Sequence, residues 1–578
     1  MTPVALAHGT GGHAERLIVC RSLSGGRGSA GTATSPSAGR PKARHSTTGG
    51  THLAPNEAPH PHGDRPLRTK AAAKRARRKL TEDDVTVVEE SLLKRAVAAA
   101  ALGNAMEWFD FGIFAYLTVT ISKVFLPEGD PAANLVATFG FFAAAFIVRP
   151  IGGAVFGPLG DKIGRQKVLA LTMILMAAGT LAIGLIPSYA TIGFWAPVLL
   201  LLARFLQGFS TGGEYGGAAT FIAEYSPDKR RGFMGSWLEF GTLAGYVLGA
   251  SIVTALQYAL PEDALLSWGW RIPFIIAGPL GLIGLYLRLK LEETPAFQKQ
   301  QEQAAERESQ KTPFLRLFAE NWRSLLICIG LVLVFNVTDY MLLSYMPTYL
   351  ETNLGQNATF GLILIVVVMV LMMIVITFGG RLSDKFGRRP VLAAGCIGFI
   401  LLSWPALKLV QSGTGLGVFF GLLILGLVLV TFTSTMPSTL PALFPTIIRY
   451  GALAIAFNVS VSLFGGTTPL ATEALIAGAK DAGISWAEDI PAFYLMLAAV
   501  IGLVAVYFTK ETASSPLMGS GPTVASEEEV ADVIKEYNDP ESELSQSDWA
   551  KDFSTSEIPI ISGDVPSSDG DTKAPAGS

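Results

Sequence analysis

The chain has 578 residues, of which 50% are hydrophobic and only 16% charged, and its mean hydropathy is +0.42. Soluble domains carry about 25% charged residues, so this composition excludes an ordinary soluble enzyme and indicates an integral membrane protein. The charge is divided unevenly: residues 1–96 hold 16 basic and 8 acidic side chains, residues 97–512 hold 25 of each, and residues 513–578 hold 3 and 14. Two charged tails therefore flank an apolar body.

Residues 1–92 are expected to form a disordered, basic, cytoplasmic tail. Residues 1–68 are rich in Gly, Pro, Ser, His and Thr, a composition that cannot bury a core. All six histidines lie in this tail, so imidazole is excluded from the chemistry of the body. The basic run Arg65–Lys79 could contact anionic lipid, although a solvated flank that sets the topology is the simpler interpretation.

The apolar body is expected to form twelve membrane-spanning helices. Each crossing needs about 20 mostly apolar residues, and charge-free runs of that length recur; Val168–Ala203 is long enough for two crossings, which Pro187 separates. The fold class is therefore an all-α integral membrane protein with six helices in residues 93–290, a cytoplasmic central loop in 291–322 and six helices in 323–512.

The orientation follows from the basic residues of the loops. With alternate loops assigned to opposite sides, the side of the two tails receives 19 Lys and Arg residues and the other side receives four. Cytoplasmic loops carry the excess of basic residues. The sequence therefore predicts a multi-pass protein of the cell membrane with both termini in the cytoplasm.

Three short motifs of the first half return in the second half. The first motif is Gly157-Pro-Leu-Gly-Asp161-Lys-Ile-Gly164-Arg165, which returns as Gly380-Arg-Leu-Ser-Asp384-Lys-Phe-Gly387-Arg388. The second is Pro227 with Arg231, which returns as Pro445 with Arg449. The third is Glu293-Thr294, which returns as Glu511-Thr512. The offsets are 223, 218 and 218 residues. Because transporters often consist of duplicated halves, the repeat predicts two related six-helix units.

The first of these motifs is a charge-dense turn between two helices in each half. Its acid is expected to meet a neighbouring helix N-terminus or an arginine, and its basic residues to anchor at the lipid surface. The candidates for signature loops and gating are Gly157, Asp161, Gly164, Arg165, Gly380, Asp384, Gly387, Arg388, Glu224, Arg231 and Arg449.

The duplicated Gly-x-Leu-x-Asp-Lys-x-Gly-Arg loop resembles the signature loop of the major facilitator superfamily, and the similarity covers about residues 95–512. Further stretches, among them 103–112 and 207–216, are similar to its metabolite:proton symporter family, and 185–197 and 439–450 resemble the branch that carries proline and glycine betaine. The resemblance implies a proton-coupled symporter that imports zwitterionic compatible solutes by alternating access. Relatives that carry 2-oxoglutarate, citrate or shikimate share the stretches that include 103–112 and 207–216, so a carboxylate:proton symporter is the alternative.

Ionisable residues at membrane depth are costly and indicate function. Asn104, Glu107, Phe111 and Phe114 share one face of the first helix, with Asp110 on the same side. Desolvation favours the neutral form of a carboxyl group, so a buried acid could bind and release a proton as its exposure alternates. An ion pair that only holds helices together is the competing interpretation for each acid.

Two arginines are expected within the bilayer. Arg149 and Arg204 could each bind a substrate carboxylate through paired hydrogen bonds or neutralise a buried acid. We expect a structural ion pair for Arg149 and favour Arg204 for the substrate or for coupling.

A quaternary ammonium is recognised by aromatic faces, and the first and seventh helices supply them together with polar groups. Packing in the core is the competing interpretation for any one ring. The substrate-binding or proton-coupling candidates are Asn104, Glu107, Asp110, Phe111, Phe114, Arg204, Glu214, Asn336, Asp339 and Tyr340.

Residues 513–578 are expected to form an acidic, disordered, cytoplasmic tail. A short helix at Glu527–Asn538 is possible, but no sustained heptads follow it. The tails contain no recognisable signalling domain, which leaves a membrane sensor as a remote alternative. No nucleophile, metal-ligand or phosphate-loop pattern is found, so we expect no enzyme, no cofactor, no metal and no nucleic-acid partner; the expected partners are the substrate, protons and the lipid bilayer.

Overall fold

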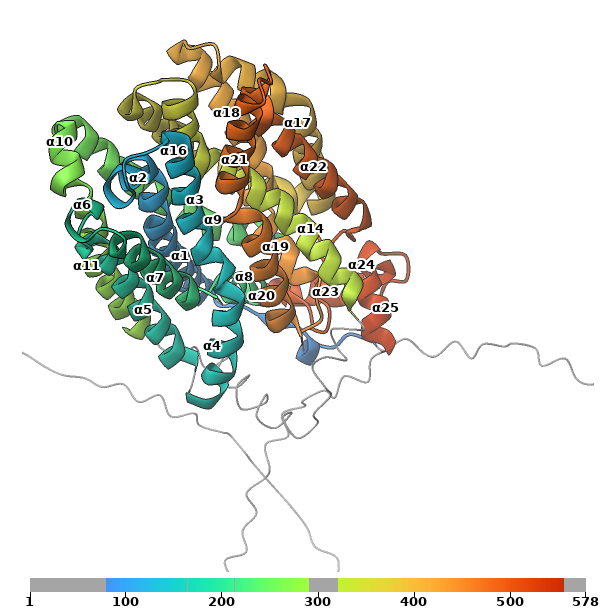
Figure 1. Ribbon diagram of the computed structural model, residues 1–578. Helices are drawn as coiled ribbons and strands as arrows, with labels where there is room; N and C mark the ends of the chain where they lie inside the picture. Colours follow the sequence, from blue (N-terminus) through green and yellow to red (C-terminus); the bar gives the residue numbers. More distant parts are fainter. Residues whose placement is uncertain (1–78, 164, 213, 291–320, 447, 556–578) are drawn as a thin grey trace, which may run out of the picture. The chain divides into compact units, whose positions relative to one another are not determined.

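The computed structural model describes residues 79–163, 165–212, 214–290, 321–446 and 448–555, which are almost entirely helical (Figure 1). Gly164, most of the expected central loop and the first 78 residues lie outside the described part. The backbone of the first signature loop is helical, with Gly157 and Asp161 in α4 and Arg165 at the start of α5, but their side chains also lie outside it.

Both halves consist of long helices joined by short connections. The first half contains α1 (Glu90–Tyr116), α2 (Thr118–Phe125), α3 (Pro131–Ile147), α4 (Arg149–Ile163), α5 (Arg165–Leu185), α6 (Tyr189–Ile192), α7 (Trp195–Ser210), α8 (Glu214–Tyr225), η2 (Asp228–Arg230), α9 (Arg231–Ala259), α10 (Glu262–Ala264), η3 (Leu265–Gly269) and α11 (Arg271–Lys290). The second half contains α14 (Trp322–Asp339), η4 (Tyr340–Tyr345), α15 (Met346–Thr348), η5 (Tyr349–Asn353), α16 (Ala358–Phe386), α17 (Arg388–Val410), α18 (Gly415–Thr433), α19 (Met436–Ala442), α20 (Arg449–Ser460), η6 (Val461–Gly465), α21 (Thr468–Asp481), η7 (Ala487–Asp489) and α22 (Ile490–Phe508).

Local sequence signals set several of these helix boundaries. Pro131 occupies the first turn of α3, and the Asp130 carboxylate accepts hydrogen bonds from the amides of Ala132 and Ala133 at 3.2 and 3.1 Å, a typical start for a helix. Gly387 has a φ of +98° between α16 and α17. Only glycine adopts this conformation without strain, so the second signature loop turns sharply there.

Small residues bring pairs of helices into close contact. A Cβ atom on Gly241 or Gly245 of α9 would clash with the carbonyl of Ala101 or Ala105 in α1, and one on Gly208 of α7 would clash with α3. Such spacings of small residues let helix backbones approach closely in membranes. These glycines therefore fix the packing of α9 on α1 and of α7 on α3.

The helices lie at all the expected positions, although fewer than twelve pass a test of length and composition. Within the described residues, eight helices are long and apolar enough to cross a membrane, and two helix pairs, bent by 62° at residue 117 and by 40° at residue 270, raise the number to ten. The remaining two positions correspond to α5, whose apolar part, Ala170–Leu185, is shorter, and to α7 followed by α8.

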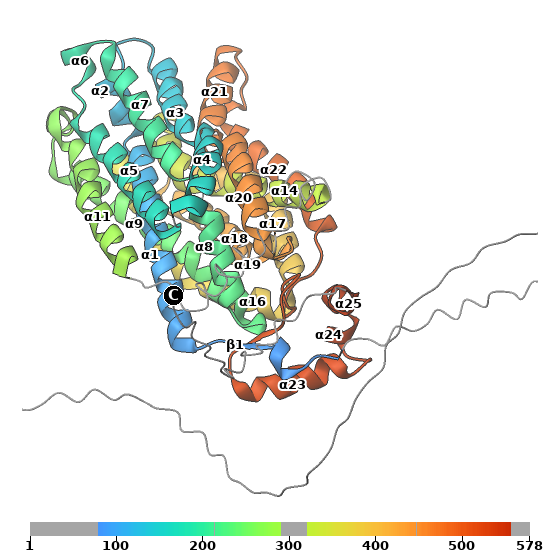
Figure 2. The same cartoon turned by 90° about the horizontal axis from the view of Figure 1, so that it is seen from below.

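The tail segments differ from the expectation of disorder. Residues 513–555 form β2 (Thr523–Val524), α23 (Glu527–Asn538), α24 (Glu543–Gln546) and α25 (Asp548–Thr555), while η1 (Glu82–Asp84) and β1 (Thr86–Val87) precede α1. Strands β1 and β2 pair in parallel, and α23 lies beside them (Figure 2). We call residues 80–88 with 513–555 the terminal layer.

The terminal layer has a small hydrophobic core of its own. Leu80, Val533, Tyr537, Trp549 and Phe553 are buried together, and the rings of Trp549 and Phe553 stack with centroids 4.9 Å apart. The prediction of disorder is therefore wrong for residues 80–88 and 513–555. It failed because these apolar side chains are sparse along the chain and form a core only when the two ends of the described chain meet.

Candidate functional site

A buried ion pair joins α1 to the start of α4. Arg149 Nη2 lies 2.9 Å from Glu107 Oε1, and both side chains are only 2% exposed. The Arg149 guanidinium also stacks over the rings of Phe111 and Phe146, at 4.7 and 4.6 Å from the ring centres. Arg149 Nε has no hydrogen-bond acceptor among the described residues. The pair therefore places an acid, a base with a spare donor and two aromatic faces in one site.

A chain of hydrogen bonds runs from Asp110 to the second buried arginine. Thr180 donates to Asp110 at 2.8 Å, Gln207 donates to Thr180 at 2.8 Å, and Arg204 donates to Gln207 at 2.5 Å. Sequence reasoning missed Thr180 and Gln207. The available signal was that each is a polar residue in a mostly apolar helix, Thr180 in α5 and Gln207 in α7.

The remaining contacts of Arg204 come from α3. Its Nε and Nη2 donate to the carbonyls of Phe141 and Phe142 at 3.2 and 3.1 Å, and its guanidinium lies 4.2 Å from the ring centre of Phe114. The side chain is fully buried. Arg204 thus binds backbone carbonyls and Gln207, whereas Arg149 is the arginine that meets an acid.

The two predicted asparagines bind protein groups. Asn104 donates to Thr242 at 2.6 Å and to a backbone carbonyl of α9, and it accepts a hydrogen bond from Trp108 at 3.2 Å. Asn336 donates to a carbonyl one turn earlier in its own helix, at 2.9 Å. Asn104 therefore orients the ring of Trp108 and links α1 to α9.

Aromatic rings from both halves converge beside the ion pair. The ring centre of Trp108 lies 5.3 Å from that of Tyr246 and 5.7 Å from that of Tyr340. Tyr340 also meets Phe146 edge to face at 5.3 Å, and Phe146 lies 4.8 Å from Phe111. Tyr340 begins the π-helical segment η4, and such segments are frequent at functional sites.

The other predicted acids lie in different surroundings. Asp339 is 2% exposed, and its Oδ1 has no hydrogen-bond partner in the described part of the chain. Glu214 accepts a hydrogen bond from Thr172 of α5 at 3.2 Å. Glu239 is a further buried acid, to which Tyr215 donates at 2.6 Å. The acids are therefore distributed over several contacts rather than gathered into one cluster.

The second signature loop connects the two halves. Both Asp384 oxygens accept hydrogen bonds from backbone amides at the start of α9, those of Gly232 and Phe233, at 2.7 and 2.8 Å. A carboxylate at a helix N-terminus is favourable. Glu224 of α8 and Arg449 of α20 form a second link between the halves, at 2.6 Å.

The repeat-related arginines Arg231 and Arg449 are buried in similar ways. Each donates through Nε to the carbonyl eight residues earlier, at 3.0 and 3.1 Å. Each also binds the terminal layer: Arg231 donates to the carbonyl of Ser515 at 2.9 Å, and Arg449 to that of Met518 at 2.8 Å. Arg388 donates to the carbonyl of Ser438 at 3.1 Å. One segment of the tail therefore contacts an arginine from each half.

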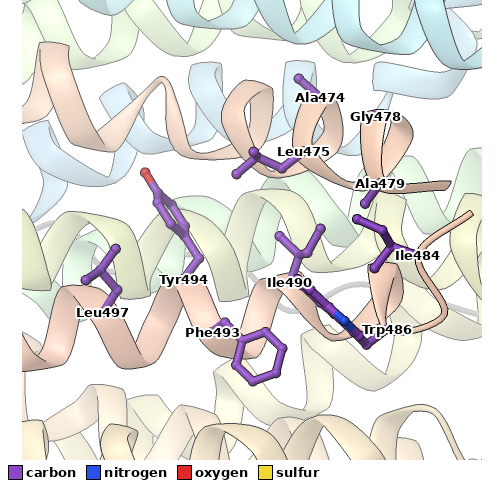
Figure 3. A pocket seen from close by; sticks show the side chains of 10 residues that line it. All are labelled: Ala474, Leu475, Gly478, Ala479, Ile484, Trp486, Ile490, Phe493, Tyr494 and Leu497. Atoms are coloured by element: carbon purple, nitrogen blue, oxygen red, sulfur yellow. The ribbon is translucent and has the colours of Figure 1, made fainter. Parts of the chain in front are cut away.

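An apolar groove of about 630 Å³ lies between α21 and α22, lined by residues such as Leu475, Trp486, Phe493 and Leu497 (Figure 3). No charged side chain lines it. A zwitterion would lose its hydration there without gaining ionic partners. The ion-paired site is therefore the better candidate for the functional centre.

Comparison with known proteins identifies the family and the fold of the chain. Residues 96–521 match the family described as sugar (and other) transporter. The chain is 49% identical to the proline/betaine transporter of Salmonella typhimurium over 80% of its length and 92% of that protein, and 49% identical to the glycine betaine/proline/ectoine/pipecolic acid transporter OusA of Dickeya dadantii over 79% and 91%. The solved structure of the major facilitator proton:xylose symporter XylE from E. coli aligns with a TM-score of 0.57 at 20% identity, covering 74% of this chain and 98% of that one.

Proposed function

Because the chain belongs to the sugar (and other) transporter family, we propose that it is a proton-coupled symporter that imports proline, glycine betaine and related zwitterions by alternating access. The buried pair of Glu107 and Arg149, set against aromatic rings from both halves, carries this proposal. The named substrates of its relatives are proline, betaine, ectoine and pipecolic acid. A zwitterion offers one carboxylate and one ammonium, and this site holds a partner for each.

The ion pair provides the coupling step. When Glu107 takes up a proton, its charge disappears and the attraction to Arg149 falls. Arg149, whose Nε has no acceptor in the described residues, then turns its charge to the substrate carboxylate, for which a guanidinium is well shaped. Proton and substrate therefore enter the closed site together, and neither enters alone without leaving a buried charge unpaired.

We assign the substrate carboxylate to Arg149 and not to Arg204. The Nε, Nη1 and Nη2 atoms of Arg204 already donate to two carbonyls and to Gln207. Taking Arg204 out of these contacts would leave buried acceptors unsatisfied, which costs about 1–3 kcal/mol for each group. Arg204 instead supports Asp110 through Thr180 and Gln207, so that a second protonatable acid lies one turn from Glu107.

Alternating access requires the links between the halves to open and close. The contacts of Asp384 with the start of α9 and of Glu224 with Arg449 would break when the site opens at that end. We assign this end, which carries both termini and most of the basic loop residues, to the cytoplasm, where anionic lipid would attract those basic residues.

Transport by the purified full-length chain in proteoliposomes tests the function. Labelled proline and glycine betaine should accumulate when an inward proton gradient is imposed, and a protonophore should abolish accumulation. Labelled 2-oxoglutarate serves as the control for the carboxylate alternative. Preferential uptake of 2-oxoglutarate would refute the substrate assignment, and accumulation that ignores the protonophore would refute the coupling.

A further inference from the structure

One buried acid takes no part in the coupling step described above. Asp339 ends α14 immediately before the π-helical η4 and is 2% exposed. Its Oδ1 has no hydrogen-bond partner, and no lysine or arginine of the described residues forms an ion pair with it. An acid in this position contrasts with Glu107, which is paired with an arginine.

The titratable groups that face Asp339 are acidic or phenolic. They are Glu239 and Tyr246 of α9, Tyr116 of α1, Tyr215 of α8 and Tyr340 of η4, all of which interact with it electrostatically. None of them supplies a positive charge. An ionised carboxylate without a counter-charge is very costly in such a place, so a bound group with positive charge and N–H bonds would satisfy Asp339.

The rings around Asp339 belong to the aromatic cluster shared by the two halves. Trp108 lies between Tyr246 of the first half and Tyr340 of the second, with centroid distances of 5.3 and 5.7 Å. The hydroxyl groups of Tyr246 and Ser344 lie 3.1 Å apart, which ties η4 to α9. The hydroxyl of Tyr340, like Asp339 Oδ1, has no hydrogen-bond partner among the described residues.

We propose that Asp339 is the hydrogen-bond acceptor for substrate N–H groups in an ammonium subsite walled by Trp108, Tyr246 and Tyr340, and that it thereby sets the preference among substrates. This inference rests on the proposed function. Aromatic faces attract any ammonium group, whereas Oδ1 serves only a substrate that has N–H bonds. Proline has two N–H bonds on its charged nitrogen and glycine betaine has none, so the rings serve both substrates and Asp339 favours proline.

This role differs from carrying the proton that drives transport, which the proposed function assigns to Glu107. An amide in its place also presents an Oδ1 acceptor without charge. Asparagine should therefore replace Asp339, whereas an apolar side chain of similar size should not.

The test measures proline and glycine betaine transport by the full-length chain in proteoliposomes for Asp339→Leu and Asp339→Asn. A hydrogen bond from a charged donor is lost only for proline in the Leu variant, so its KM for proline should rise roughly tenfold or more relative to its KM for betaine. The Asn variant should keep the wild-type ratio within about threefold and should still accumulate both substrates.

Several results would overturn the inference. Equal losses of proline and betaine transport in the Leu variant would show a packing role, and unchanged transport of both would show no role. Loss of accumulation in the Asn variant, with exchange intact, would make Asp339 a proton carrier. If the Leu variant fails to reach the membrane, the same ratio measured with Asp339→Ala decides. Failure of the wild-type chain to accumulate either substrate would instead refute the proposed function.

Discussion

Neutralising Glu107 tests the coupling step most directly. In Glu107→Gln a charge is lost from a carboxylate that lies 2.9 Å from Arg149, in a pair whose side chains are both 2% exposed. Breaking a buried ion pair by removing one partner typically costs about 3–5 kcal/mol, because the other charge remains buried. This cost falls on the substrate-free protein. A substrate carboxylate that pairs with Arg149 recovers part of it.

The Gln variant should therefore be less stable when empty and should gain more from its substrate. If binding recovers about 2 kcal/mol of the cost, the affinity for betaine rises about 30-fold over the wild type. Thermal unfolding of the detergent-solubilised protein, with and without betaine, measures both effects. In proteoliposomes the variant should exchange labelled for unlabelled betaine but should not accumulate it, since glutamine cannot carry a proton.

A matched control comes from an exposed ion pair. Lys123 and Glu262 lie 2.8 Å apart with side chains 53% and 68% exposed, and such pairs contribute little to stability. Glu262→Gln should leave accumulation and unfolding unchanged. Wild-type accumulation by Glu107→Gln would refute the coupling role, and an unchanged melting temperature would refute the argument from the buried charge.

Three other substitutions test the packing and the links between the halves. Trp549→Ala removes a ring that is 5% exposed and stacks on Phe553, which should lower the stability of the terminal layer by about 3–5 kcal/mol. Limited proteolysis within residues 513–555 should accelerate, while the helical circular dichroism of the bundle persists. Unchanged resistance to the protease would contradict this. Gly245→Val places a side chain against the carbonyl of Ala105 and should sharply reduce the amount of folded protein in the membrane. Gly140→Ala, where a Cβ meets nothing within 4 Å, should leave that amount unchanged. Equal yields of the two variants would contradict the packing argument. Arg449→Gln removes the ion pair with Glu224 and the hydrogen bond to the terminal layer. A cysteine introduced by Ser236→Cys, at a buried position, should then react several times faster with a thiol reagent. An unchanged rate would show that the ion pair does not hold this end closed.

Much of the fold could be predicted because membrane crossings leave a strong signal along the chain. Charge-free runs located the helices, and the repeated loop ending at Arg388 indicated two related halves. The family resemblance and the all-helical fold are confirmed by the comparisons. The terminal layer could not be predicted in this way, because its contacts join residues far apart in the sequence. The side-chain amide of Asn538 forms two hydrogen bonds with the backbone of Leu80, which lies 458 residues away.

The candidate site was predictable as a set of residues but not as a set of partners. Helical periodicity placed Glu107 and Phe111 on one face, and both lie at the ion-paired site. Periodicity does not reveal which arginine reaches which acid. Position along the helix favoured Arg204 over Arg149 for the substrate, because Arg149 lies only eight residues before Gly157. The backbone carbonyls that bind Arg204 in the fold leave no mark in a sequence.

The attachment of the tail to both halves limits how far they can separate. Arg231 and Arg449 bind the carbonyls of Ser515 and Met518, which are three residues apart. Even a fully extended chain spans only about 10 Å over three residues. Any opening at this end that moves the two arginines further apart than this tether allows must first detach one of them, so every transport cycle that opens this end widely also releases the tail.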